Sequence, residues 1–328
     1  MDKTKIIHCT ACGYTGAAAD FDQHPNGSGV WCPDCDAFIW HNPKNNNQHI
    51  GLLLEQSVPG TRSTTAAVLK LNKRLSPLRY PGGKSKLIDC LFANVQTSKC
   101  DTFVEVFAGG ASFGLALLDA GIVKNLVLND KDPYLINFWS QVIHNPDGLI
   151  KRLSTISPTH ADYDQAKAFL SEGGSHDPLD AAWAYLLLNR LSYSGIQKAG
   201  CQGGKDGSTE ALLARYNPKA IIKRITRIAE LHGQITLLNQ DFTETIENYY
   251  WNDKATLFVD PPYFGKGKAL YSHYFTDQDH RALSELLQSL TLEFPGCADI
   301  LITYDNAPFI EDLYWSMDPK YIARKYSI

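Results

Sequence analysis

From residue 76 onward, short apolar runs alternate with longer amphipathic segments. The apolar runs have the length of strands, and the segments between them have the spacing of helices. The order is helix, strand, helix, strand, a long and mainly helical insert, and then three more strands with a helix at about 277–290. The expected strands cover residues 102–108, 125–128, 234–239, 255–260 and 298–304. This order predicts an α/β fold with a doubly wound, Rossmann-like and mainly parallel sheet.

A glycine or an aspartate lies at the carboxyl end of four of these predicted strands: Gly109, Asp130, Asp241 and Asp260. In an open α/β sheet, the ligand crevice lies outside the carboxyl ends of the strands. We therefore expect a single crevice to be lined by all four residues.

The strand at 255–260 ends in Asp260-Pro261-Pro262-Tyr263. Proline lacks a backbone N–H, so the sheet ladder cannot continue through it. A carboxylate, a stiff turn with free carbonyls and an aromatic ring suit a planar base that carries an exocyclic amino group. The carboxylate accepts one amino hydrogen, a carbonyl of the proline turn accepts the other, and the ring stacks on the base. The alternative is a strand-ending turn with a buried tyrosine.

A second candidate site is the turn Gly109-Gly110, which follows the strand at 102–108 and precedes an apolar helical pattern. This arrangement lets a ligand meet backbone N–H groups at a helix start. Asp130 follows the glycines by about 20 residues, where an acidic side chain takes ribose hydroxyls in dinucleotide-binding folds. Alternatively, Asp130 caps the helix that begins near Asp132.

Upstream, the loop 76–84 contains Tyr80, two glycines and Lys84. The glycines allow close backbone approach to a ligand. Tyr80 offers a face for an adenine ring, and Lys84 offers a cation for a carboxylate. A basic surface turn before a helix is the alternative for this loop taken alone.

Together the motifs resemble those of the Dam-type, or D12-class, DNA N6-adenine methyltransferases over residues 76–328. The resemblance rests on residues 80–84, 103–110, 128–130, 189–195, 240–242, 260–263 and 274–276. It implies transfer of a methyl group from S-adenosylmethionine to N6 of a flipped adenine in double-stranded DNA.

The resemblance also implies roles for single residues. The implied cofactor-binding residues are Tyr80, Lys84, Phe107, Gly109, Gly110, Asp130, Asp241, Phe242 and Asp260. The implied catalytic residues are Asp260, Pro261, Pro262 and Tyr263, with Tyr263 stacking on the target base. Glu105 also matches the family, and within a strand its alternative role is to bond the neighbouring loop.

The insert at 145–230 corresponds to the family's target-recognition domain. Arg190, Tyr193, Gln197 and Lys198 are the candidates for contacts with DNA bases or phosphates. Arg190 has an alternative role, in which it braces the active-site loop. The continuation at 196–201 departs from the pattern of enzymes that read GATC, so a different target is expected.

The composition is that of a soluble globular protein, with 44% apolar and 20% charged residues among 328. The net charge of −4 gives no global sign of nucleic-acid binding, but seven basic residues and no acidic one lie between Glu55 and Asp89. Another basic cluster, at 219–227, lies in the insert. Such stretches beside a methyl-transfer site favour phosphate contacts. We expect no membrane segment, no signal or transit peptide, and a cytoplasmic protein encoded by a bacterium or phage.

Four of the eight cysteines form the pattern Cys9-x₂-Cys12 and Cys32-x₂-Cys35. This spacing is typical of a four-thiolate structural zinc site, which leaves no open coordination position. Disulfide pairing is the alternative and fits poorly with a chain that lacks an export signal.

The predicted domains are a zinc ribbon at 1–41, a linker at 42–75, a catalytic domain at 76–144 and 231–328, and the insert. Within the linker, 51–56 has the pattern of either a short helix or a strand. The last eight residues alternate like an unfinished strand, so the final hairpin of the usual sheet is expected to be missing or formed differently.

The expected protein is thus a monomeric DNA adenine methyltransferase, with a cognate restriction or defence system as a candidate partner. Alternatives are a cytosine-N4 methyltransferase, an RNA adenine methyltransferase and a catalytically inactive DNA-binding relative. Asp260 favours adenine, because cytosine-N4 enzymes more often carry serine there.

Overall fold

The computed structural model describes residues 50–57, 71–80, 82–173, 177–265, 267, 274–317 and 319–324, and five short strands before residue 50. Its contacts divide the chain into one unit of residues 1–48 and 285–296 and another of residues 49–284 and 297–328.

The smaller unit contains two antiparallel sheets. In one, β1 (Ile6–His8) pairs with β2 (Thr15–Ala17); in the other, β4 (Gly29–Trp31) lies between β3 (Asp22–Gln23) and β5 (Phe38–Trp40). The cysteines of the predicted zinc site, Cys9, Cys12, Cys32 and Cys35, lie outside the described residues.

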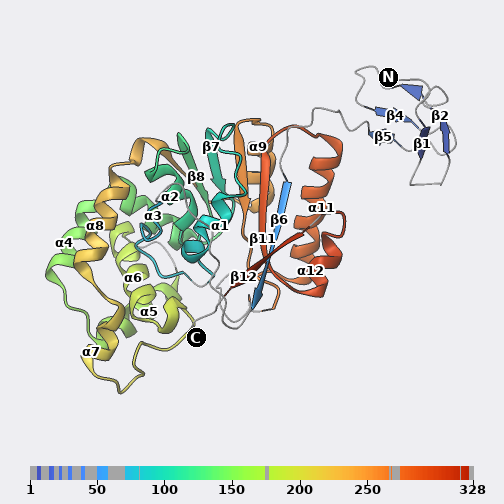
Figure 1. The fold of residues 1–328 in the computed structure, drawn as a ribbon. Helices are drawn as coiled ribbons and strands as arrows, with labels where there is room; N and C mark the ends of the chain where they lie inside the picture. The colour runs from blue at the N-terminus through green and yellow to red at the C-terminus, as the bar shows by residue number, and fades with distance from the viewer. Residues whose placement is uncertain are drawn as a thin grey trace. The chain divides into compact units, whose positions relative to one another are not determined.

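The larger unit is built on a seven-stranded sheet with the order β12-β6-β11-β10-β7-β8-β9. Its strands are β6 (Ile50–Ser57), β7 (Thr102–Glu105), β8 (Asn125–Asn129), β9 (Ile235–Leu238), β10 (Ala255–Val259), β11 (Asp299–Asp305) and β12 (Pro319–Arg324). Every neighbouring pair is parallel. The predicted doubly wound parallel sheet is confirmed (Figure 1).

Aromatic packing fixes the centre of the sheet. Every residue of β10 is buried, as expected for a central parallel strand. Phe103 of β7 and Phe258 of β10 pack against Phe113 of α2 (Ser112–Asp119), with ring centroids 5.2 and 5.4 Å from Phe113. Because burying a phenylalanine contributes about 1.5–3 kcal/mol, this cluster anchors the helix that follows the glycine turn.

Strand β6 corrects the predicted bounds of the linker. Residues 50–57 form β6, which lies between β11 and β12, so the linker cannot extend over 42–75. The physical reason is the buried apolar run Leu52 to Leu54, which requires cover on both faces. β12 pairs in parallel with β6, so β11 and β12 do not form a hairpin with each other.

The helices of the insert are α4 (Pro146–Thr155), α5 (His160–Glu172), α6 (Pro178–Leu191), α7 (Thr209–Leu212) and α8 (Pro218–Ala229). They gather beside α3 (Pro133–His144), as Figure 1 shows, and α6 and α8 contact it. Asp177, Thr159 and Asn217 cap α6, α5 and α8 through side-chain acceptors. One hydrophobic core runs from the sheet into these helices, so the insert is held firmly against the strand ends.

The structure also describes the helices α1 (Ile88–Phe92), α9 (Phe242–Tyr250), α11 (Asp277–Glu293) and α12 (Pro308–Leu313). In Figure 1, α2 and α3 lie on one side of the sheet and α12 lies on the other. Among the described residues, no helix is both long and apolar enough for a membrane crossing.

Candidate active site

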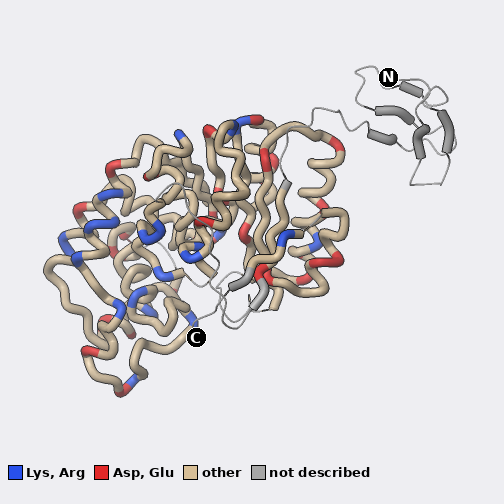
Figure 2. The backbone as a smooth tube through the Cα atoms, viewed as in Figure 1, with Lys and Arg blue, Asp and Glu red and all other residues tan. Residues whose placement is uncertain are grey.

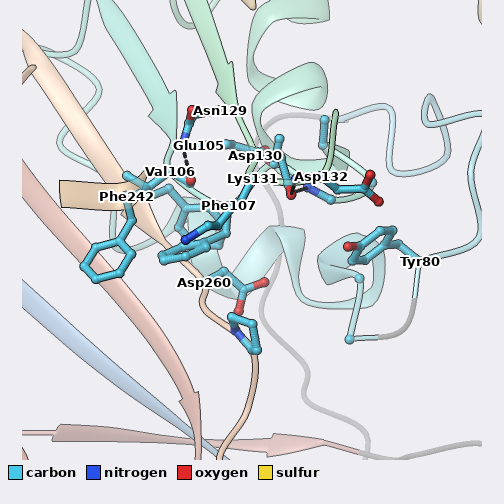
Figure 3. Close-up of a pocket in the computed structure, with 18 of the residues that line it drawn as sticks. Tyr80, Glu105, Val106, Phe107, Asn129, Asp130, Lys131, Asp132, Phe242 and Asp260 are labelled. Atoms are coloured by element: carbon cyan, nitrogen blue, oxygen red, sulfur yellow. Dashed lines mark hydrogen bonds between the residues drawn. The ribbon is translucent and has the colours of Figure 1, made fainter. Parts of the chain in front are cut away.

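A cavity of about 360 Å³ opens at the carboxyl ends of β7, β8 and β10. Its wall includes all four strand-end residues predicted to share a crevice, Gly109, Asp130, Asp241 and Asp260. The wall also includes Tyr80, Lys84, Phe107, Gly110, Phe242 and Pro262. In the view of Figure 3, Phe107 and Phe242 stand on one side, Tyr80 stands on the other, and Asp260 lies between them. The volume falls within the range of small-molecule pockets, about 300–1,000 Å³.

The glycine turn packs tightly against Tyr80. Gly109 has φ +45°, and a Cβ there would lie 2.7 Å from Cε1 of the Tyr80 ring. A Cβ on Gly110 would lie 2.9 Å from Cβ of Tyr80. Glycine is therefore required at both positions by the close approach, and at Gly109 also by the left-handed backbone. The carbonyl of Gly109 accepts the indole N–H of Trp139 at 3.1 Å, and this hydrogen bond holds the turn against α3.

Asp130 lies at the end of β8 and faces the glycine turn. Its Oδ2 accepts the backbone N–H of Gly109 at 3.0 Å, and its Oδ1 accepts that of Asp132 at 3.0 Å. The cap of α3 is Asp132, which accepts the N–H groups of Tyr134 and Leu135. The alternative in which Asp130 caps this helix is therefore wrong, and its carboxylate borders the cavity instead.

Three aromatic rings line one side of the cavity. Phe107 follows β7, Phe242 begins α9, and Phe275 precedes α11. Their centroids are 5.9 Å apart for Phe107 and Phe242, 5.5 Å for Phe107 and Phe275, and 5.4 Å for Phe242 and Phe275. Beside them, Asp241 caps α9 and forms a 3.0 Å ion pair with Lys131. This aromatic wall offers a surface for a flat heterocycle.

The acidic corner is formed by Asp260 and its donors. Nζ of Lys84 lies 2.6 Å from each carboxylate oxygen of Asp260, and Oγ1 of Thr303 donates to Oδ1 at 2.7 Å. The side chain of Lys84 is 3% exposed and that of Asp260 is 18% exposed. Within the chain, the close partner of Lys84 is thus Asp260, and its expected contact with the carboxylate of a ligand stays a prediction.

Tyr263 contacts both Lys84 of the acidic corner and Glu55 of β6. Its hydroxyl donates to Oε1 of Glu55 on β6 at 2.5 Å, and Nζ of Lys84 lies 4.9 Å from its ring centroid. The residue is 6% exposed. One ring face is therefore engaged by Lys84, and stacking of Tyr263 on a target base stays a prediction.

Burial raises the proton affinity of two carboxyl groups at the site. Burial is the main cause that raises the pKa of Asp260 above its ordinary value, while Lys84 opposes the shift. Burial also raises the pKa of Glu105 to about 8, against the lowering effect of the Gly114 N–H. Glu105 accepts that N–H at the start of α2, so its bonding role is the one the structure shows.

The structure separates the four residues expected to contact DNA. Arg190 is 6% exposed and donates to the carbonyl of Pro77, and burial lowers its pKa to about 9. This corrects the assignment of Arg190 to the DNA-contact set and supports its alternative role of bracing the loop. Gln197 lines the cavity, Tyr193 is exposed, and the exposed Lys198 lies 5.5 Å from the ring centroid of Tyr274 at the cavity wall.

Several site residues were not identified from the sequence. Glu55 was placed in a linker, and Thr303 lies in a strand whose apolar pattern gives it no distinguishing signal. Asn189 clamps the loop at Arg79, accepting its N–H and donating to its carbonyl, each at 2.8 Å. The signal for Asn189 was present in the motif at 189–195, and for Phe275 in the motif at 274–276.

The side chains suit an adenosine-containing ligand such as S-adenosylmethionine. The cavity combines an aromatic wall, a carboxylate at a strand end and backbone held close by glycines. Gln240 also lines the cavity, and its Oε1 is buried with no hydrogen-bond partner among the described residues. A buried polar atom of this kind normally has a partner, and a ligand with amino or hydroxyl donors is a candidate for it.

Comparison with known proteins supports the same interpretation. Residues 80–328 match the family model described as D12 class N6 adenine-specific DNA methyltransferase. The chain is 25% identical over 256 residues to the Retron Ec67 DNA adenine methylase of Escherichia coli, covering 76% of this chain and 84% of that protein. It is 24% identical over 267 residues to the type II methyltransferase M1.LlaDCHI of Lactococcus lactis subsp. cremoris, covering 75% and 87%. A third relative, the type II methyltransferase M.CviBI of Paramecium bursaria Chlorella virus NC1A, is 22% identical over 245 residues, covering 72% and 85%.

Proposed function

Because the chain belongs to the D12 class of N6 adenine-specific DNA methyltransferases, we propose that Asp260 orients N6 of a target adenine beside bound S-adenosylmethionine. The observation that carries the proposal is the hydrogen-bond state of the Asp260 carboxylate. Its Oδ1 accepts from Lys84 and Thr303, whereas Oδ2 accepts from Lys84. A carboxylate oxygen accepts two bonds. Within the part of the chain that the structure describes, Oδ2 has one donor, which leaves one acceptor position for an amino N–H.

The cofactor is proposed to lie between Tyr80 and the aromatic wall. Phe107 and Phe242 provide stacking for its adenine, and Asp130 accepts its ribose hydroxyls. Gly109 and Gly110 bring the backbone close to the ligand. Bound in this way, S-adenosylmethionine supplies an electrophilic methyl group at the acidic corner.

The protein residues act mainly by position and charge. Asp260 and a carbonyl of the turn at Pro261 and Pro262 hold the two amino hydrogens, which directs the nitrogen lone pair toward the methyl donor. As N6 gains the methyl group and positive charge, the Asp260 carboxylate stabilises that charge. N6 then loses one proton, which leaves the neutral methylated base. Extrusion of the base costs a few kcal/mol, which pocket contacts offset.

The variant Asp260→Asn tests this assignment, because asparagine keeps the size and one acceptor oxygen but removes the charge. We expect kcat to fall by about 100-fold or more, with cofactor affinity nearly unchanged in calorimetry. The exposed Asp312→Asn in α12 is the matched control. A D260N enzyme with a wild-type kcat excludes Asp260 from the chemistry.

For DNA binding, we propose phosphate contacts by Arg79, Arg215 and Arg224, which come from the loop at 71–80, η4 (Leu213–Arg215) and α8. Burial, and then the nearby charge of Arg215, lower the pKa of Arg79, so Arg79 and Arg215 lie near each other. Arg224 donates to the carbonyl of Ser76 in the same loop at 3.0 Å. Elsewhere among the described residues, Arg152 and Arg227 are engaged in ion pairs with carboxylates. Figure 2 shows further basic positions along α8.

The salt dependence of DNA binding tests this interface. Each phosphate that a protein neutralises adds about 0.9 to the steepness with which log K falls against log salt. We expect Arg215→Gln and Arg224→Gln each to make the slope shallower by about this amount. Arg152→Gln, whose guanidinium pairs with Asp180 in the same insert, serves as control. Equal slopes for all three variants and the wild type contradict the proposed interface.

Tyr193, Gln197 and Lys198 are proposed to contact bases or phosphates next to the cavity. Tyr193 is 50% exposed, and Lys198 projects beside Tyr274, an exposed residue of the wall. A bidentate base contact discriminates by about 1–3 kcal/mol. Sequencing the methylated DNA of Gln197→Ala therefore tests its role, since relaxed target specificity is expected.

We also propose that Cys9, Cys12, Cys32 and Cys35 bind a structural zinc ion. The support is their sequence spacing, which matches four-thiolate sites. Metal analysis of the purified chain should find one zinc per protein, lost in Cys12→Ser and retained in Cys297→Ser. Thiol titration that finds two disulfides and no metal overturns this proposal.

A cellular role beside a restriction or defence system is proposed from the relatives, one a retron methylase and two type II methyltransferases. Expression of the chain should then protect co-resident DNA from one restriction endonuclease. A cytoplasmic, monomeric protein is expected, and light scattering measures the oligomeric state.

A further inference from the structure

Glu55 brings a carboxylate into the active site from outside the family match, which begins at residue 80. It lies on β6, where its backbone is paired with Asp305 of β11 on one side and Ile322 of β12 on the other. Its carbonyl also accepts the N–H of Asn306 at 3.1 Å. Two neighbouring strands therefore fix the position from which this side chain enters the site.

The carboxylate of Glu55 meets two residues of the acidic corner. Its Oε1 accepts the hydroxyl of Tyr263 at 2.5 Å and lies 3.5 Å from Nζ of Lys84. The side chain is 0% exposed. Glu55 and Asp260 thus share the ammonium group of Lys84. Asp260 lines the cavity, whereas the side chain of Glu55 is fully enclosed.

This arrangement affects the chemistry of Asp260. A lysine that had only Asp260 as a charged neighbour would neutralise that carboxylate more fully. A second carboxylate draws part of the lysine charge away, so Asp260 stays a stronger acceptor for an amino N–H. Consistent with this, burial and then the charge of Glu55 raise the pKa of Asp260, against the effect of Lys84.

We propose that Glu55 is a positioning residue for methyl transfer, which holds Lys84 and Tyr263 in place and sustains the acceptor strength of Asp260. The proposal rests on the role of Asp260 in the proposed function. It assigns part of the active site to the strand that precedes the family match.

A purely structural role is the competing explanation, because a buried carboxylate with two partners also stabilises the sheet edge. The two explanations differ in kinetics. A structural residue changes the stability or the fraction of active enzyme, whereas a positioning residue changes kcat and the pH profile of correctly folded enzyme.

The experiment measures kcat, cofactor affinity and the pH–rate profile of Glu55→Gln. Glutamine keeps an acceptor for the Tyr263 hydroxyl and removes the charge. We expect kcat to fall by about 100-fold, unchanged cofactor affinity, and an acid limb moved to lower pH, because Asp260 becomes easier to ionise. The control is Glu311→Gln, since Glu311 accepts the Tyr321 hydroxyl at 3.0 Å outside the cavity wall and should show none of these changes.

A Glu55→Gln enzyme with wild-type kcat, or with an unmoved acid limb, overturns the proposal. If glutamine prevents folding, Glu55→Asp provides the test, because it keeps the charge but withdraws it from Tyr263. The aspartate variant should then show reduced kcat with the acid limb near its wild-type position, and full kcat counts against the proposal. Asp260→Asn distinguishes a failure of this proposal from a failure of the proposed function. An active Asp260→Asn enzyme refutes the proposed function. An inactive Asp260→Asn enzyme together with a fully active Glu55→Gln enzyme refutes only the role of Glu55.

Discussion

Replacing Lys84 by methionine removes the cation between two carboxylates while preserving most of the volume of the side chain. The side chains of Lys84, Glu55 and Asp260 are 3%, 0% and 18% exposed. Removing one partner of a buried ion pair costs about 3–5 kcal/mol, because the remaining charge is left without compensation. Since Asp260 is partly exposed, we expect a loss near the lower value, about 3 kcal/mol. For the larger unit, at about 2.1 cal/mol/K of unfolding entropy per residue, this corresponds to a decrease in Tm of roughly 5 °C.

The loss should depend on pH. Without Lys84, the pKa of the Asp260 carboxyl group rises further in the folded state, because the cation that opposes the effect of burial is gone. The stability of the variant is then greatest at low pH, where Asp260 is protonated, and falls as pH rises through the folded-state pKa. Lys84→Met and the wild type should therefore differ least in the acid range and most in the alkaline range.

Thermal denaturation across this range is the assay, with two further variants. Lys84→Met/Asp260→Asn should recover part of the lost stability, because one of the two uncompensated charges is removed. Lys73→Met is the matched control, because Lys73 pairs with Asp89 while 42% exposed, and exposed pairs contribute about 0–1 kcal/mol. A Lys84→Met protein as stable as the wild type at high pH would refute the electrostatic reasoning, as would a double variant less stable than Lys84→Met.

Three further predictions follow from the cavity wall. Phe242→Ala should raise the Kd of S-adenosylmethionine by about tenfold in calorimetry, because an aromatic stacking contact contributes about 0.5–1.5 kcal/mol; an unchanged Kd contradicts the stacking role. Gly109→Ala should abolish cofactor binding, since its Cβ would lie 2.7 Å from the Tyr80 ring at φ +45°, and normal affinity argues against a tight turn. Glu105→Gln should flatten the pH dependence of Tm. Burial raises the pKa of Glu105 to about 8 in the folded state, so the contribution of this group to stability is fully present below about pH 4.5 and is lost as pH rises toward 8. The loss is at most about 1.4 kcal/mol per pH unit. An identical pH dependence in the variant contradicts this assignment.

Five of the strands and the position of the cavity could be predicted from the sequence, for a clear physical reason. A parallel sheet gathers its strand ends at one edge, so Gly109, Asp130, Asp241 and Asp260 had to lie near one another once their strands were recognised. The buried run of β10, followed by Pro261 and Pro262, marked the site most strongly, because proline ends the sheet ladder beside Asp260.

The contacts across the sheet edge could not be predicted. Glu55 reaches the site only because β6 lies between β11 and β12, and this pairing leaves no local signal in residues 50–57. The contact of Lys84 with Asp260 was also not predicted, because a sequence pattern gives the charge of a side chain but not the direction in which it points. Arg190 is a similar case, since its burial results from the packing of α6 beneath the loop that it braces.

The most direct test of the central claim is nucleoside mass spectrometry of duplex DNA treated with the purified protein and isotope-labelled S-adenosylmethionine. The account predicts label in N6-methyladenine, nearly all of it lost with Asp260→Asn while that variant still binds the cofactor. Label in N4-methylcytosine, transfer to RNA but not to duplex DNA, or undiminished labelling by Asp260→Asn would contradict it.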